Sequence, residues 1–219
     1  MATAIIGVGN IGSAVAGHLV AGDEVVVLAA KDPSDAETLA VKLGPRASAA
    51  SVEDAIAGAD TIVFALWLDA LREVLPRNSQ GLEDKVVIDP SNPLGFDENG
   101  QMIRTLPDGQ SSGSIVASLL PATAHYVKAF GTVAADSLAN SANREPRVVL
   151  FYATDDDEAA ATAERLIRAA GFDPLKVGGV AEAIRIEMPG GDLHQAGLNG
   201  ALLDLDQARA ALATTGATA

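Results

Sequence analysis

A run of three spaced glycines is the part of the sequence with the clearest chemical meaning. The run has the form Gly7-x-Gly9-x-x-Gly12, and it separates a short apolar stretch from an amphipathic one. Between a strand and a helix, the first glycine permits a tight turn, the second lets the backbone approach a pyrophosphate, and the third allows close packing. The free N–H groups at the helix N-terminus hold the anion. We therefore expect Gly7, Gly9, Asn10, Ile11 and Gly12 to bind a dinucleotide.

The end of the second apolar strand should distinguish NAD from NADP. This strand runs to Ala30, and Lys31 and Asp32 follow it. An acid at this point binds the ribose 2′-OH of NAD, and a count of about 20 residues past the last glycine leads to Asp32. Lys31, however, directly follows the strand and carries a charge suited to a phosphate. We favour NADP in contact with Ala30 and Lys31, while NAD stays possible and Lys31 could instead be a solvated loop residue.

Three further groups of residues lie at or just after the carboxyl ends of strands, where open α/β sheets bind ligands. These candidates for coenzyme contact are Leu66, Trp67, Leu68, Ser91, Asn92, Pro93, Ala129 and Phe130. Trp67 is the only tryptophan, and it could form a wall beside the nicotinamide or simply pack in the core. Ser91 and Asn92 could hydrogen-bond the nicotinamide amide or the substrate, or serve the turn alone.

No group of residues predicts acid–base, nucleophilic or metal chemistry carried by the protein itself. The sequence has no cysteine, no nucleophile elbow, no Ser/His/Asp arrangement and no paired catalytic carboxylates. Its three histidines lack the spacing of metal ligands. We interpret the acidic run 155–158 as the N-terminus of a helix and Lys128 as a strand-edge residue. The sequence thus predicts no catalytic side chain and no metal site.

Charge and hydropathy exclude several classes of partner. The net charge of −14, from 15 basic and 29 acidic residues, disfavours binding to nucleic acid and to anionic lipid. The first apolar run is too short for a signal sequence, and no run approaches the roughly 20 residues of a membrane span. We expect a cytoplasmic protein with a small-molecule or cofactor substrate. An apolar helix expected at 198–212 could form a homodimer interface or be buried within one chain.

The elements that must position these residues alternate along the chain. Apolar runs at 3–8, 24–28, 61–66, 85–89, 125–130, 147–153 and 172–177 predict strands, with a weaker one at 46–49. Amphipathic runs between them predict helices, and the turn signals within 96–109 predict a small hairpin or excursion from the sheet. The fold class is α/β, a Rossmann-type doubly wound, mostly parallel sheet. We expect a dinucleotide-binding domain at 1–180 and a small, mainly helical segment at 181–219 that covers the site.

Taken together, the motifs resemble the NADPH-dependent deazaflavin (coenzyme F-420) reductase family, the F-420-dependent NADP oxidoreductases. The resemblance spans most of residues 1–190 and rests on the glycine run and on residues 30–33, 65–71, 87–93 and 127–132. It implies a Rossmann domain with a small C-terminal part over the nicotinamide. It also implies that Lys31 stands where the family has an arginine for the 2′-phosphate, and Ala30 where it has a serine. Residues 113–117 depart from the family, whose members often carry an acid there.

By this resemblance we expect an NADP(H)-dependent oxidoreductase that transfers a hydride between the nicotinamide and a deazaflavin or flavin. Catalysis would then consist of stacking two rings and excluding water, because the cofactors carry the chemistry. Two alternatives stay open: a dinucleotide-binding redox sensor without turnover, and a small dehydrogenase or imine-reductase-like enzyme. The second kind of enzyme usually adds a long helical domain, and about 40 residues after Val180 are too few for one.

Overall fold

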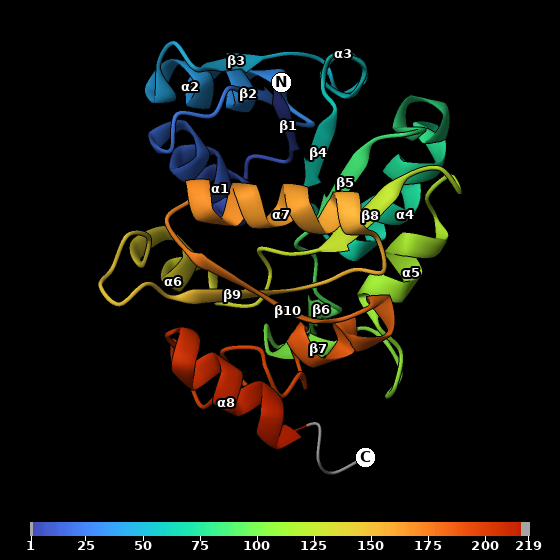
Figure 1. Cartoon of the computed structure of the whole chain (residues 1–219). Coiled ribbons are helices and arrows are strands. Elements are labelled where there is room, and N and C mark those ends of the chain that lie inside the picture. Colours follow the sequence, from blue (N-terminus) through green and yellow to red (C-terminus); the bar gives the residue numbers. More distant parts are fainter. Residues whose placement is uncertain (1, 216–219) are drawn as a thin grey trace.

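The strands and helices follow one another in the alternation that the sequence predicts (Figure 1). The computed structural model describes residues 2–215. Its strands are β1 (Thr3–Ile6), β2 (Val26–Ala29), β3 (Ala47–Ala49), β4 (Thr61–Phe64), β5 (Val86–Asp89), β6 (Leu94–Phe96), β7 (Met102–Arg104), β8 (His125–Lys128), β9 (Val149–Ala153) and β10 (Asp173–Gly178). Its helices are α1 (Asn10–Ala21), α2 (Pro33–Leu43), α3 (Val52–Gly58), α4 (Leu68–Arg77), α5 (Ser112–Ser118), α6 (Ala135–Asn140), α7 (Asp157–Ala169) and α8 (Leu205–Thr215), with 3-10 helices η1 (Ser79–Leu82) and η2 (Val180–Ile186).

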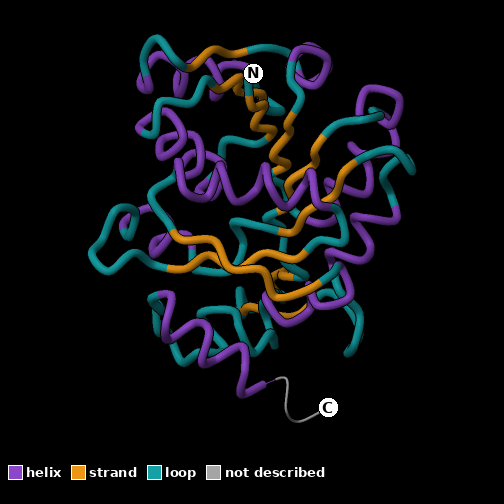
Figure 2. Tube along the Cα trace, in the orientation of Figure 1, coloured by secondary structure: helices purple, strands orange, loops and turns teal. Residues whose placement is uncertain are grey.

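Eight of the strands form one sheet in the order β10-β9-β8-β5-β4-β1-β2-β3. Figure 2 shows the strands in orange among the purple helices. β1 lies between β2 and β4 and pairs in parallel with both. β9 runs antiparallel to β8, and β10 runs parallel to β9. This is the doubly wound, mostly parallel Rossmann-type sheet that the sequence predicts. It brings the carboxyl ends of β1, β2, β4, β5 and β8 to one edge, where such sheets bind their ligands.

Apolar side chains of alternating strand residues fill a core on each face of the sheet. Ile5 and Val63 pack on the face covered by α1, α2, α6 and α7. Ile6 and Ile62 pack on the opposite face, which α3, α4 and α5 cover. Because both faces are buried, the central strands are apolar at almost every position. A third core lies between β9, β10 and the C-terminal residues.

The excursion predicted between the fifth strand and the next helix is a hairpin of β6 and β7, outside the main sheet. Its turn contains Asn99 and Gly100, and Gly100 has a φ of +74°, which favours glycine. The carboxylate of Asp97 accepts hydrogen bonds from the backbone N–H groups of Asn99 and Gln101 at 2.9 and 2.8 Å. In Figure 1 the hairpin and α8 lie in the lower half of the molecule, beyond the carboxyl end of β4.

The C-terminal part differs from the mainly helical segment and from the helix over 198–212 that the sequence predicts. Turns and irregular backbone occupy residues 187–204, and the final helix begins only at Leu205. Gly190 and Gly200 adopt φ angles of +108° and +84°, and these left-handed residues stop a helix from running through the segment. The start of α8 is set by Asp204 and Gln207, whose side chains each accept a hydrogen bond from the other's backbone N–H. Residues 216–219 of the predicted segment lie outside the described residues.

Candidate functional site

The glycine run lies at the carboxyl end of β1, and each glycine meets a different steric demand. Gly7 has a φ of +96°, and a Cβ there would lie 2.5 Å from the carbonyl oxygen of Ala65. A Cβ on Gly12 would lie 1.8 Å from the carbonyl oxygen of Gly7, so helix α1 can approach the turn only with glycine at this position. A Cβ on Gly9 would meet nothing within 4 Å. Two glycines are therefore explained by packing within the chain, whereas Gly9 borders open space.

That open space is the place where a pyrophosphate would lie. Gly9 is the residue before the first turn of α1, and Gly9 and Asn10 are both exposed. No acidic side chain lies in the first turn of α1, so nothing there repels an anion from the helix N-terminus. The residues present thus fit the phosphates of a dinucleotide.

At the end of β2 the structure separates the two candidate ribose contacts. The Asp32 carboxylate accepts hydrogen bonds from the Ser34 backbone N–H at 3.0 Å and from its hydroxyl at 2.8 Å. These bonds lower the pKa of Asp32 and make it the N-cap of α2. Lys31 is exposed and directly follows the half-buried Ala30. The Asp32 carboxylate is therefore engaged in capping α2, whereas the Lys31 side chain is exposed at the end of β2. This arrangement agrees with a site for NADP.

The three candidates after β4 lie in different environments. Leu66 packs against the glycine turn, with its Cδ2 atom 2.8 Å from the point that a Cβ on Gly7 would occupy. Trp67 is 58% exposed and makes an edge-to-face contact with Phe96 of the hairpin. The side chain of Leu68 is buried in the core beneath α4. Of the three, Trp67 presents the largest accessible surface at this edge.

The candidates after β5 and β8 are held by contacts within the chain. The Asn92 amide donates to the carbonyl of Gly131 at 3.0 Å and accepts from the N–H of Met188 at 2.9 Å, so it links three loops. Ser91, Pro93 and Ala129 are buried. Phe130 is also buried, and its φ of +66° is unusual for a residue with a side chain. Any contact of Ala129 or Phe130 with a coenzyme must therefore come from the main chain.

A buried ionic network beside these loops was missed by the sequence analysis. Lys128 is not the strand-edge residue that the sequence suggests, because β8 lies between β5 and β9 and the side chain is 2% exposed. Its ammonium lies 3.0 Å from a carboxylate oxygen of Asp89 and 3.5 Å from one of Glu187. It also donates to the Ser91 carbonyl and, at 2.9 Å, to the Ser112 hydroxyl. One ammonium thus lies between two carboxylates in a hydrogen-bonded network inside the protein.

Glu187 is held from two directions. Its carboxylate accepts hydrogen bonds from the Ser111 hydroxyl at 2.8 Å and from the backbone N–H groups of Ser112 and Gly113 at 3.0 and 2.7 Å. Gly113 is required here, since a Cβ would lie 2.7 Å from the Cβ of Ala183 and 3.3 Å from the Glu187 carboxylate. Residues 113–117 of α5 lack the acid that members of the resembled family often carry. Glu187, from the C-terminal segment, places its carboxylate at the N-terminus of α5 instead.

The phenol of Tyr126 completes the network on the Asp89 side. It donates a hydrogen bond to Asp89 at 2.9 Å, and Tyr126 and Lys128 project from the same face of β8. Burial, together with the nearby carboxylate of Asp89, raises the pKa of Tyr126 well above its ordinary value. The phenol is therefore a fixed hydrogen-bond donor and not a proton source at neutral pH.

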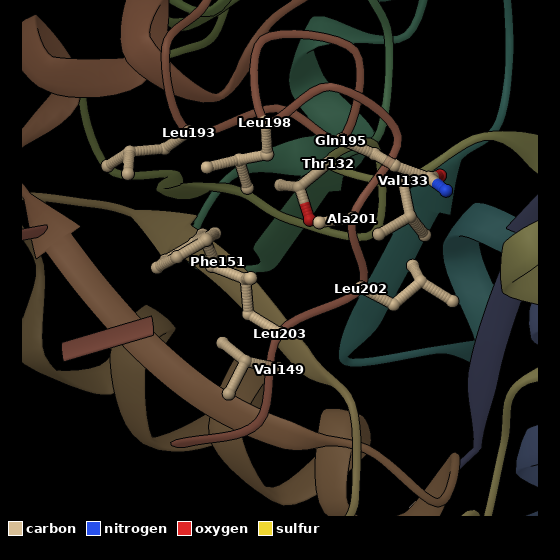
Figure 3. Close-up of a pocket in the computed structure, with 10 residues that line it drawn as sticks. All are labelled: Thr132, Val133, Val149, Phe151, Leu193, Gln195, Leu198, Ala201, Leu202 and Leu203. Carbon is tan, nitrogen blue, oxygen red and sulfur yellow. The ribbon is translucent and has the colours of Figure 1, made fainter. Parts of the chain in front are cut away.

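Two cavities lie away from the glycine run. The first, between the end of β8, strand β9 and the C-terminal turns, has a volume of about 10 Å³, enough for roughly one water molecule (Figure 3). Its lining is Thr132, Val133, Val149, Phe151, Leu193, Gln195, Leu198, Ala201, Leu202 and Leu203. The second has a volume of about 250 Å³ and borders Tyr126, Asp155 and Asp156 at the amino end of β8. Neither cavity is lined by a residue of the glycine run.

The acidic run is the helix N-terminus that the sequence predicts. Asp156 caps α7 by accepting the Ala159 N–H at 2.8 Å, and it binds the imidazole of His125 at 2.7 Å. Within residues 2–215 no three His, Asp or Glu side chains are placed to hold a metal ion. In the same part of the chain, no helix combines the length and the apolar character needed to cross a bilayer.

Comparison with known proteins gives a family match for the first part of the chain. Residues 2–93 match the family described as "NADP oxidoreductase coenzyme F420-dependent". The chain is 30% identical over 183 residues to the metalloreductase STEAP3 of Rattus norvegicus, covering 84% of this chain and 35% of that protein. It therefore spans about a third of the length of this relative. The family resemblance predicted from the sequence is confirmed over the first 93 residues.

Solved structures extend the likeness over nearly the whole chain. A hypothetical protein, SMa0349 of Sinorhizobium meliloti, superposes with a TM-score of 0.79 at 27% identity, covering 93% of this chain and 95% of that one. A protein of Arthrobacter sp. FB24, provisionally named an F420-dependent NADP reductase, gives 0.72 at 22% identity with 83% and 86% covered. The NADPH-bound reductive aminase of Aspergillus terreus gives 0.59 at 20% identity, with 90% of this chain and 59% of that one covered. The two structures below 25% identity show a shared fold, and the match of residues 2–93 supports an NADP-dependent oxidoreductase.

Proposed function

We propose that the protein transfers a hydride between NADP(H) and a deazaflavin or flavin acceptor. The observation that carries the proposal is the open space over Gly9 at the exposed N-terminus of α1. Close contacts within the chain explain the glycines at positions 7 and 12 but not the one at position 9. The family match over residues 2–93 includes this loop and the end of β2 with Lys31. The deazaflavin or flavin as acceptor is the part of the proposal that an assay must decide.

In this proposal the chain's own residues bind and orient the coenzyme. The backbone N–H groups of Gly9, Asn10 and Ile11 would hold the pyrophosphate, and the Lys31 ammonium would bind the 2′-phosphate. Asn92 fixes the loops after β5 and β8 relative to each other by its hydrogen bonds to Gly131 and Met188. These loops would border the nicotinamide, and their rigidity would limit the positions that its ring can take.

The network around Lys128 supports the same edge without taking part in chemistry. Its side chain is 2% exposed, and the ammonium is engaged by Asp89, Ser91, Ser112 and Glu187 within the protein. When bound, NADPH supplies a hydride from C4 of the nicotinamide, and the acceptor ring takes up one further proton from solvent. The protein would contribute position and exclusion of water, which suits a reaction between two rings.

The test is NADPH oxidation followed at 340 nm with riboflavin, FMN, coenzyme F-420 and a ferric complex as acceptors. We expect turnover with at least one of the ring acceptors and a preference for NADPH over NADH. The Gly9→Val variant is the control, because it should fold normally and lose the reaction. Tight NADPH binding without oxidation by any acceptor would refute the enzyme and leave the redox-sensor alternative.

A second candidate function follows from the likeness to the reductive aminase of Aspergillus terreus. The chain matches 59% of that protein's length, so the shared part is the dinucleotide-binding fold. The same assay with a ketone and an amine in place of the flavin separates the two functions. Oxidation of NADPH only in the presence of both ketone and amine would favour the imine-reductase-like enzyme.

A further inference from the structure

An apolar surface patch stands beside the candidate coenzyme site. It consists of Trp67, which follows β4, and the hairpin residues Phe96 and Met102, which are 58%, 58% and 50% exposed. The rings of Trp67 and Phe96 lie 6.3 Å apart at an interplanar angle of 73°. Phe96 and Met102 are direct cross-strand partners and so share one face of the hairpin. The three side chains therefore form one continuous patch, which we call the Trp67 patch.

The chain connections place the Trp67 patch at the edge where the coenzyme would bind. Trp67 directly follows Leu66, which packs against the glycine turn at Gly7. The hairpin begins directly after the loop that contains Asn92 and Pro93, at the carboxyl end of β5. The patch is thus next in sequence to two of the loops that would contact the dinucleotide.

The hairpin that carries two residues of the patch is fixed at its base. Arg104 pairs with Leu94 across the two strands, and its guanidinium donates to the carbonyls of Pro189, at 2.7 Å, and of Gln110. The N–H of Thr105 donates to the carbonyl of Pro93 at 2.9 Å. Because these bonds hold the base of the hairpin, Phe96 and Met102 are presented in a defined position. A preorganised apolar surface binds a ligand with little loss of conformational entropy.

The size of the patch distinguishes a small ligand from a protein partner. An aromatic or similarly large side chain offers about 150–250 Å² of surface, so three half-exposed side chains offer roughly 300 Å². A stable protein interface needs about 800 Å² from each partner. The patch is therefore too small for a dimer interface by itself, and its extent suits one tricyclic ring.

We propose that the Trp67 patch binds the flat ring of the electron acceptor, an isoalloxazine or a deazaflavin, by stacking and apolar contact. The proposal rests on the proposed function, since it names where the acceptor of that reaction binds. Trp67 offers an aromatic face, Phe96 stands edge-on to it, and Met102 adds a polarizable sulfur. No charged side chain belongs to the patch, which fits an uncharged ring.

The sole tryptophan makes the proposal directly measurable. Riboflavin, which has the ring without a phosphate, is titrated into the protein saturated with NADP⁺ while the fluorescence of Trp67 is recorded and corrected for inner-filter absorption. We expect saturable quenching in the unmodified protein. Phe96→Ser and Met102→Ser should each raise the riboflavin Kd at least about five-fold. Ile103→Ser is the matched control, because Ile103 is 41% exposed on the same strand but faces the other side of the hairpin.

The outcomes separate this proposal from the proposed function. Saturable quenching that Phe96→Ser weakens supports the patch, even if no acceptor oxidises NADPH and the proposed function fails. NADPH oxidation by riboflavin with an unchanged Kd in Phe96→Ser and Met102→Ser would overturn the patch and leave the proposed function standing. Equal weakening of riboflavin binding by Ile103→Ser also overturns the patch. A third result would do the same: Phe96→Ser or Met102→Ser changes the oligomeric state in size-exclusion chromatography but leaves the riboflavin Kd unchanged. That result would identify the patch as a self-association surface.

Discussion

Lys128 and Glu187 meet inside the protein with 3.5 Å between the ammonium nitrogen and a carboxylate oxygen, and both side chains are fully or almost fully buried. This contact joins β8, in the sheet, to the turns of the C-terminal segment. Glu187 also receives the hydrogen bonds of Ser111, Ser112 and Gly113 at the start of α5. One ion pair thus connects three parts of the chain that lie around the candidate site.

Replacement of Lys128 by Met should strongly destabilise the fold. The substitution keeps a similar side-chain volume but leaves the carboxylates of Asp89 and Glu187 buried without their cation. Loss of one partner from a buried pair costs about 3–5 kcal/mol. We expect a decrease of this size in the free energy of unfolding measured in urea, whereas Lys42→Met, at an exposed position, should change it by less than about 0.5 kcal/mol.

A double variant tests whether the lost stability comes from the stranded charge. In Lys128→Met/Glu187→Gln the uncharged amide no longer needs the ammonium, so the double variant should be more stable than the sum of the single changes predicts. Strict additivity of the two single changes would show that the two side chains do not interact energetically.

The sequence predicted the sheet and the glycine loop because both depend on neighbouring residues. Apolar runs and the glycines that end them determine each strand and turn locally, and the strand predicted over 85–89 matches β5 to within one residue. Gly7 and Gly12 meet the tight turn and the close packing expected of them for the same reason, and Gly9 borders open space. The C-terminal turns were missed because an Ala- and Leu-rich composition favours helix, while the glycines at 190, 191, 197 and 200 decide the backbone.

The buried network could not be predicted because its members are distant in sequence. Asp89 and Lys128 are 39 residues apart, and Ser112 and Glu187 are 75 residues apart. One signal was present: Lys128 stands in an otherwise apolar strand, between Val127 and Ala129, where a charged side chain needs a buried partner. Naming that partner required the order of strands β5 and β8, which a single sequence does not give.

Gly9 and Gly12 should respond to added side chains in opposite ways. Gly9→Val places a side chain in open space at a φ of −67°, which valine tolerates, so the melting temperature should hardly change. The same side chain would occupy the place of the pyrophosphate, and NADPH affinity should fall at least about ten-fold, or 1.4 kcal/mol. Gly12→Ala should instead lower the melting temperature, because its Cβ would lie 1.8 Å from the Gly7 carbonyl.

Differential scanning fluorimetry and isothermal titration calorimetry together check this pair of variants. An unchanged NADPH affinity in Gly9→Val would remove the pyrophosphate from this loop. A loss of stability in Gly9→Val equal to that in Gly12→Ala would show that the space over Gly9 is needed for folding and not for a ligand.

Replacement of Lys31 by Ala should change the choice of coenzyme. If the ammonium binds the 2′-phosphate, the variant should bind NADPH more weakly by about 1 to 3 kcal/mol, the scale of a lost charge-assisted hydrogen bond. NADH has no 2′-phosphate, so its affinity should stay nearly constant. Calorimetric titration with both coenzymes gives the two values. Equal weakening of NADPH and NADH would place Lys31 outside the coenzyme site.

His194 should make the fold less stable in mild acid. The side chain is 1% exposed, and burial lowers its pKa from 6.5 to about 4, so the folded protein keeps the imidazole neutral. Its Nδ1 accepts the N–H of Ala196 at 3.0 Å, which leaves the proton on Nε2. The unfolded chain binds a proton as the pH falls below about 6.5, and the folded chain does so only near 4. The free energy of unfolding should therefore decrease as the pH falls between these values, by about 2 kcal/mol from pH 7.5 to 5.0.

The His194→Gln variant isolates this contribution, because all other groups titrate alike in both proteins. His125, whose pKa is raised by its hydrogen bond to Asp156, acts in the opposite direction and cancels in the comparison. The unmodified protein should lose about 2 kcal/mol more than the variant between pH 7.5 and 5.0 in urea unfolding. Proton NMR gives a direct check, since His194 should titrate near pH 4 and His125 above 6.5. Titration of His194 near 6.5 would mean that its ring reaches solvent and that the C-terminal turns open in solution.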